Sequence, residues 1–311
     1  MNKRALIVIA VIAVLVVASA AVAVMYLGKG PDNKGTEGTI SIIDDRGKTV
    51  NLTEAPQRIV SLGSAFTEII FDLDAKGKVV AVDSSSMWMV NNQTDNITNM
   101  REVSKLSVES VIDQDPDLVV IWNFDMYSPL ITNMESSGMK VVAFYPKNIT
   151  TILSTIEVLG EAIGEKDKAK EMVTSMQARI DAVVEKTSGL SESERPKIYL
   201  ELMSKGGQTV GNGTMSNDLI NMAGGYNIFS NGTKNWLAST ESIVEKNPDI
   251  IIIENQSAKT NDVLKATLGP SVTAVSEDKI YRIDGTTLTT SPRVVDALEN
   301  MAKWFHPELF A

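Results

Sequence analysis

The sequence predicts an α/β protein made of two similar lobes with parallel sheets, which one long helix joins. Three observations support this prediction: a segment that occurs twice, an alternation of strand patterns with helix patterns, and a long helical pattern near the middle of the chain. Strands that alternate with helices favour parallel sheets with right-handed crossovers.

The repeated segment has the length and spacing of a lobe-level duplication. Residues 107–121 (SVESVIDQDPDLVVI) occur again as residues 239–253 (STESIVEKNPDIIII), at a constant offset of 132 and without a gap. Six of the fifteen positions are identical. This offset is too long for a solenoid repeat and matches a whole lobe.

Each copy of the repeat predicts a short helix followed by a buried strand. The first serine can cap a helix, and the glutamate two residues later lies in the first turn, where the helix dipole favours a negative charge. The residue before proline is pushed out of the α region, so the helix ends there. The β-branched run that follows is typical of a strand buried on both faces. We interpret Asp117 and Asp249, between proline and strand, as strand-entry residues.

The remaining elements are assigned from their periodicity and turn residues. Strand patterns lie at residues 39–43 and 48–52 (a hairpin), 58–62, 78–82, 139–144 and 197–202. Helix patterns lie at residues 64–73, 127–137, 149–186 with a break near Gly164, 216–223 and 291–305. The stretch 165–186 would form one helix of about 33 Å, at ~1.5 Å per residue. We divide the chain into residues 1–27 (membrane anchor), 28–38 (linker), 39–148 (N-terminal α/β lobe), 149–187 (connecting helices) and 188–311 (C-terminal α/β lobe).

The composition excludes several classes of function. The net charge of −10 disfavours a nucleic-acid partner. The chain has no cysteine and a single histidine, His306, so thiolate sites and three-histidine metal sites cannot be built. We therefore expect that the protein is not an enzyme and that it has no cofactor and no metal site. Catalysis by carboxylates alone remains an open alternative. We expect a monomer.

The N-terminus predicts a membrane helix. Lys3 and Arg4 precede residues 5–27, which carry no charge and are long enough to span a bilayer. The positive residues should stay in the cytoplasm, so the body would lie outside the cell membrane on a single-pass anchor. A cleaved signal is the alternative, because residues 18–20 and 21–23 both resemble cleavage sites. The anchor is preferred because the apolar run continues past both sites.

A polar linker and several glycosylation sequons follow this segment. Residues 28–38 are rich in glycine and polar residues, as flexible tethers are. Asn-x-Ser/Thr sequons occur at Asn51, Asn92, Asn96, Asn148, Asn212, Asn231 and Asn255. They predict an exported glycoprotein, and the alternative is that a chain rich in Asn, Ser and Thr contains them by chance.

Several motifs together resemble a known family. They are residues 58–62 before 67–69, the two glutamate-containing repeats, 223–229 (AGGYNIF), 291–293 (SPR) and 306–310 (HPELF). In the order and spacing of these motifs, residues 39–310 resemble the substrate-binding proteins of ABC importers for iron–siderophore, haem and cobalamin. This resemblance implies two Rossmann-like lobes joined by one rigid helix, with a small-molecule ligand held between them. It also implies a permease dimer with its ATPase as the partner.

The resemblance assigns a docking role to Glu109 and Glu241. In this family a surface glutamate from each lobe engages arginine pockets on the two permease subunits, and both residues match that pattern. Arginine–carboxylate pairs are bidentate and charge-assisted, so two of them fix a docking orientation. The alternative is that both glutamates only complement helix dipoles.

Candidate ligand residues follow the predicted strands, because open α/β sheets bind ligands at the carboxyl ends of their strands. They are Ser64, Trp88, Trp122, Phe124, Tyr127, Trp236 and Arg293. The aromatic residues offer flat surfaces for a macrocycle or a catecholate chelate, and the alternative is that some pack beneath their loops. Arg293 either faces an anionic ligand or forms a salt bridge within its own helix.

The sequence departs from the pattern of the cobalamin-binding members. Residues 284–290 lack the acidic and basic pair expected there, and residues 103–104 lack an aromatic side chain before Glu109. We therefore predict a binding protein for an iron(III) chelate (siderophore or haem) or a corrinoid. The alternatives are a cobalamin-specific binding protein and an extracellular ligand sensor without a transporter.

Overall fold

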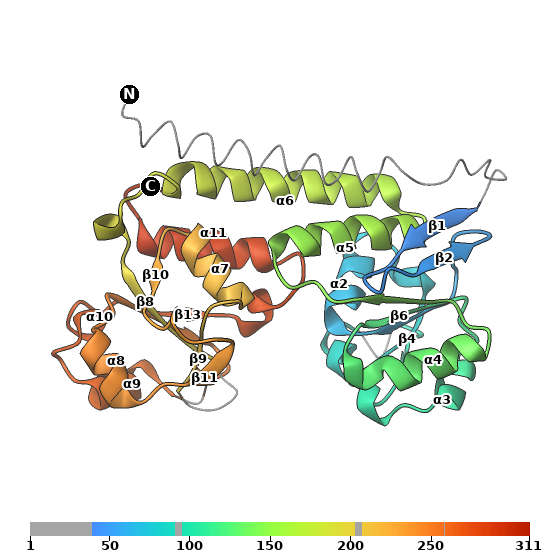
Figure 1. Cartoon of the computed structure of the whole chain (residues 1–311), viewed down its shortest axis with the longest axis horizontal. Coiled ribbons are helices and arrows are strands. Elements are labelled where there is room, and N and C mark those ends of the chain that lie inside the picture. Colours follow the sequence, from blue (N-terminus) through green and yellow to red (C-terminus); the bar gives the residue numbers. More distant parts are fainter. Residues whose placement is uncertain (1–38, 91–94, 203–206, 258) are drawn as a thin grey trace. The chain divides into compact units, whose positions relative to one another are not determined.

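Two separate β-sheets with helices on their faces organise the chain (Figure 1). The computed structural model describes residues 39–90, 95–202, 207–257 and 259–311. Residues 40–311 form one compact unit, and the description below concerns this unit alone. We call the part built on the first sheet the first lobe and the part built on the second sheet the second lobe.

The sheet of the first lobe is parallel throughout, as predicted. Its strands, in spatial order, are β5 (Thr98–Asn99), β4 (Val79–Val82), β3 (Ile59–Leu62), β6 (Leu118–Trp122) and β7 (Val141–Phe144). Its helices are α2 (Ser64–Asp72), α3 (Val108–Ile112) and α4 (Ser128–Ser136). All four residues of β3 are buried: Ile59 belongs to one hydrophobic cluster, and Val60 and Leu62 belong to another. This burial explains the continuous apolar runs in the sequence.

A β-hairpin precedes this sheet. Strands β1 (Ile40–Ile43) and β2 (Thr49–Leu52) pair antiparallel, which confirms the predicted hairpin. The buried Asp44 lies in its turn and accepts hydrogen bonds from the backbone of Arg46, Lys48 and Ala143. The hairpin is thereby fixed to β7.

The sheet of the second lobe is mixed, which corrects the prediction of purely parallel sheets. Its strands, in spatial order, are β11 (Asn235–Leu237), β9 (Gln208–Val210), β8 (Lys197–Leu202), β12 (Ile250–Glu254) and β13 (Ile280–Ile283), and β10 (Tyr226–Asn227) also pairs with β8. Strand β9 runs antiparallel to both β8 and β11. Only residues 203–207 separate β8 from β9, and this connection is too short for the crossover that a parallel pair needs. The helices of this lobe are α7 (Met215–Met222), α8 (Thr240–Lys246), α9 (Asn261–Leu268), α10 (Thr273–Ser276) and α11 (Val294–Phe305).

Two helices connect the lobes. Helix α5 (Ile149–Ala162) ends before Gly164, whose φ of +81° suits glycine, and α6 (Lys166–Thr187) follows. The predicted break and the predicted long helix are both confirmed. Helix α6 packs against α5 and against α11, so it contacts both lobes (Figure 1).

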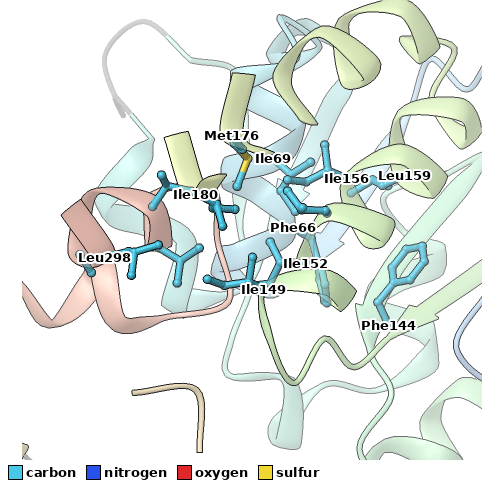
Figure 2. Packing of buried hydrophobic residues seen from close by; sticks show 14 of the residues in the cluster. Phe66, Ile69, Phe144, Ile149, Ile152, Ile156, Leu159, Met176, Ile180 and Leu298 are labelled. Atoms are coloured by element: carbon cyan, nitrogen blue, oxygen red, sulfur yellow. The ribbon is translucent and has the colours of Figure 1, made fainter. Parts of the chain in front are cut away.

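One hydrophobic cluster continues from the first lobe through these helices into the second. Figure 2 shows part of it, with labelled residues from α2 (Phe66, Ile69), β7 (Phe144), α5 (Ile149, Ile152, Ile156, Leu159), α6 (Met176, Ile180) and α11 (Leu298). Close packing of this kind resists deformation. The connection between the lobes is therefore a packed core and not a simple linker.

The predicted membrane helix at residues 5–27 lies outside the described residues. Among the helices of residues 39–90, 95–202, 207–257 and 259–311, none combines the length and the apolar character that a membrane span requires.

Candidate functional site

The two copies of the repeat form nearly identical structures around Glu109 and Glu241. Ser107 accepts a hydrogen bond from the backbone of Ser110 at 3.2 Å, and Ser239 accepts the equivalent bond at 3.2 Å. Both glutamates are exposed in the first turn of their helices, α3 and α8. Hydrogen bonds from their own backbone N–H groups and from the serine hydroxyls lower the pKa of both carboxyls. Both carboxylates are thus exposed and ionised at neutral pH.

In both repeats the helix ends before the proline, with α3 ending at Ile112 and α8 at Lys246. Asp115 and Asn247, the residues before the prolines, have positive φ angles of 47° and 45°. The predicted stop is confirmed, and the chain leaves the right-handed α region into the left-handed one, which Asp and Asn tolerate better than most residues.

Aromatic side chains gather at the carboxyl end of β6 in the first lobe. The rings of Trp122 and Phe124 stack with centroids 5.2 Å apart and an interplanar angle of 2°. Tyr127 and Tyr145 contact Phe124 at 5.7 and 5.2 Å. Three of the predicted ligand residues therefore lie together, and Ser64 begins α2 directly after the neighbouring strand β3.

The tryptophan of this cluster, Trp122, lies directly against the backbone of Gly63. A Cβ atom on Gly63, the residue after β3, would collide with the Trp122 indole, so only glycine allows the ring to lie against the backbone at this place. A similar glycine contact occurs in the second lobe, where a Cβ on Gly232 would collide with the indole of Trp236 in β11. Trp236 also meets the edge of Phe229 at 5.2 Å and remains 37% exposed.

Arg293 is bound by a carboxylate of the other lobe. Its Nε and Nη2 atoms donate to the two carboxylate oxygens of Glu68 on α2, at 2.6 and 2.8 Å. Its Nη1 atom donates to the hydroxyl of Thr286 at 2.7 Å. The predicted alternative of a salt bridge within its own helix is therefore wrong. The guanidinium also lies 4.8 Å from the ring centre of Trp88, which is 58% exposed.

Two residues at this site were not predicted. Tyr145 follows β7 at its carboxyl end, so the rule that selected Phe124 after β6 also selects Tyr145. Glu68 belongs to a run of six consecutive buried residues in α2, and a buried carboxylate indicates a partner. The partner itself, 225 residues away, has no signal in the sequence.

The arrangement provides surfaces for binding. Exposed or half-buried aromatic faces lie at the carboxyl ends of β6 and β7 in the first lobe, whereas Trp236 lies within the edge strand β11 of the second lobe and not after a strand as predicted. Such faces suit planar, largely apolar ligands. Within the described ranges, no group of three or more His, Asp or Glu side chains is arranged to hold a metal ion.

Comparisons with known proteins show similarity over most of the chain. An uncharacterized ABC transporter substrate-binding lipoprotein of Bacillus subtilis is 29% identical, over 93% of this chain and 95% of its own length. A cobalamin-binding protein of Halobacterium salinarum is 24% identical, over 85% of this chain and 73% of its own length. The crystal structure of a periplasmic solute binding protein from Veillonella parvula superposes with a TM-score of 0.75, at 19% identity and over 88% of each chain.

These findings correct the predicted single-pass location. The B. subtilis relative is named a lipoprotein, and lipoproteins are held at membranes by covalently attached lipid, not by a spanning helix. In the part of the chain that the structure describes, no helix is suited to span a membrane. The single-pass location is therefore wrong.

The family assignment depends on the extent of the match. The periplasmic binding protein family matches residues 59–287, which include both copies of the repeat, both sheets and the long helix between them. This chain belongs to the periplasmic binding protein family.

Proposed function

We propose that the protein is the substrate-binding component of an ABC importer that takes up an iron(III) chelate or a corrinoid. The single observation that supports this most is the matched pair Glu109 and Glu241. Both carboxylates are exposed, and both lie in the first turn of helices that have a serine N-cap. Two such groups on one scaffold suit a partner that offers two equivalent basic pockets, as a permease dimer does.

Ion pairs between these two glutamates and arginines of the permease would act in docking more than in ligand capture. Arginine binds a carboxylate through two parallel hydrogen bonds, so each contact constrains direction as well as distance. Two contacts on different lobes would constrain the rotation of the whole protein on the permease.

The aromatic residues support the proposed ligand class. Trp122, Phe124 and Tyr127 form one group in the first lobe, and Trp236 is the exposed tryptophan of the second. Flat rings gain contact area against a planar macrocycle or a catecholate chelate. The name of the H. salinarum relative, a cobalamin-binding protein, agrees with a corrinoid as one candidate.

Ligand titration tests this proposal. The chain has four tryptophans, so quenching of their fluorescence can report binding. The probes are ferric siderophores, haem, cobalamin and cobinamide, with molybdate as a small oxyanion that lacks an aromatic or macrocyclic surface. Saturable quenching by one chelate or corrinoid supports the proposal. Failure of all of them, with molybdate bound instead, contradicts the proposed ligand class.

A further inference from the structure

The ion pair between Glu68 and Arg293 joins the two lobes directly. Glu68 lies on α2 of the first lobe, and Arg293 immediately precedes α11 of the second. We propose that Glu68 and Arg293 are positioning residues that hold the two lobes in one relative orientation. This contact is separate from the covalent connection through α5 and α6.

The burial of the pair makes its separation costly. The Glu68 side chain is 8% exposed and the Arg293 side chain 27%. A carboxylate this deeply buried needs its cation, because an unpaired buried charge has lost most of its hydration. Any rotation of the lobes that withdraws Arg293 would leave Glu68 without this partner. The fork of two bonds at 2.6 and 2.8 Å also fixes the direction of approach.

Further contacts hold the guanidinium from both lobes. Thr286 of the second lobe accepts its third hydrogen bond, and Trp88 of the first lobe covers its face. A cation over an indole ring is attracted by the negative face of the ring. Arg293 is thus restrained by Glu68 and Trp88 on one side and by Thr286 on the other.

An open cavity lies beside the pair. It has a volume of about 460 Å³ and is lined by Asp72 of α2, Met176 and Arg179 of α6, Asp296 of α11 and Arg293 itself. The walls of a hollow lack the dense contacts that fix orientation elsewhere in a core. At this place the ion pair provides the contact that the cavity lacks.

The consequence for transport rests on the proposed function, whereas the positioning role does not. Glu109 and Glu241 belong to different lobes, so the distance between them depends on how the lobes are oriented. If the permease requires one spacing, loss of the ion pair weakens docking without changing either glutamate.

Distance measurements by pulsed electron paramagnetic resonance on spin-labelled protein test the proposal, and they need neither ligand nor transporter. The chain has no cysteine, so D113C and E245C give two specific labelling sites. Both positions are exposed and are related by the same offset of 132. E68Q and R293Q are expected to broaden the distance distribution between the labels, and the charge swap E68R/R293E is expected to narrow it again. The control is D278N, which breaks the ion pair of Asp278 with Lys265 inside the second lobe.

The outcomes separate this proposal from the proposed function. A folded R293Q protein with the wild-type distribution contradicts the positioning role, whatever the ligand proves to be. If R293Q does not fold by circular dichroism, E68Q decides, because glutamine keeps the size of the side chain and removes the buried charge that pairs with Arg293. Broadening in E68Q supports the proposal, and an unchanged distribution overturns it. Failure of every ligand titration would leave this result unaffected.

Discussion

Asp117 and Asp249 make the same contact in the two halves of the chain. The Asp117 carboxylate accepts the backbone N–H groups of Gln57 and Arg58 at 2.7 and 3.0 Å. The Asp249 carboxylate accepts the backbone N–H of Lys197 at 2.8 Å. Each aspartate precedes an interior strand, β6 or β12, and fixes the start of the central strand beside it, β3 or β8. The interpretation of both as strand-entry residues agrees with this geometry.

This contact leads to a prediction about stability. D117A and D249A are each expected to lower the free energy of unfolding by about 1 kcal/mol, the usual size of one hydrogen-bonded contact. Urea denaturation measures the change. The control is D113A, which removes an exposed aspartate after α3. Ligand affinity should not change, and a loss of binding in folded D117A or D249A would show that these residues belong to the ligand site.

The docking role of Glu109 and Glu241 predicts a separation of two activities. The double reversal E109K/E241K is expected to abolish the stimulation of the importer's ATPase in proteoliposomes, because like charges would then face each other. Ligand affinity should remain unchanged, since both glutamates are on the outer surface of their helices. The matched control is E157K/E185K, which reverses two exposed glutamates on α5 and α6. Normal coupling in E109K/E241K would rule out the docking role.

The two glycines that contact tryptophan rings, Gly63 and Gly232, predict that one added methyl group disturbs each ring. G63A and G232A are each expected to displace the indole above them, Trp122 or Trp236, at a cost of about 1–3 kcal/mol for an overpacked site. The emission maximum of tryptophan fluorescence should shift, and the affinity for the bound chelate or corrinoid should fall. G189A is the control, because a Cβ at Gly189 meets no atom within 4 Å. Unchanged affinity in both variants would remove these tryptophans from the ligand site.

The elements that are local in sequence were predicted well. Caps, prolines and β-branched runs lie within fifteen residues in each repeat, and they identified α3 with β6 and α8 with β12. The short strands β9 and β11 were missed because each has only three residues, too few for a periodic pattern. The division of the chain at residues 148 and 187 stays a prediction.

Contacts between distant residues were the least predictable part of the site. The aromatic residues after β6 were found because strand ends can be read from the sequence. The partner of Arg293 could not be found, since Glu68 depends on how two lobes are placed and not on any local pattern. The roles of all nine candidate residues stay predictions until binding and docking are measured.

Glycosylation is a further prediction that the structure makes testable. The six sequon asparagines within the described ranges are all exposed, namely Asn51, Asn96, Asn148, Asn212, Asn231 and Asn255. Exposure is the physical requirement for attaching a bulky glycan. Glycopeptide mass spectrometry of the protein from its native host should find at least one of them modified. Six unmodified peptides would favour chance occurrence of the sequons.

Asp72 predicts how stability depends on pH near the lobe junction. Burial of its carboxyl and the nearby charge of Glu68 raise its pKa to about 6, although Arg293 acts in the opposite direction. The folded protein therefore holds this proton more tightly than the unfolded chain, in which the aspartate has its ordinary pKa of 3.8. Between these two values the contribution of Asp72 to stability falls as pH rises, and above about pH 6 the penalty is fully present.

The variant D72N removes this titration. At pH 7.5 the D72N variant should melt at a higher temperature than the wild type. At pH 3.5 the two proteins should melt at the same temperature, because the folded wild type then carries a protonated, uncharged carboxyl group at position 72. The gain should be small, since Asp72 remains partly open to solvent. Thermal unfolding followed by circular dichroism across this range provides the measurement, and D181N, which changes an exposed aspartate on α6, is the control. An equal effect of D72N at both pH values would mean that the carboxyl acts through packing and not through its charge.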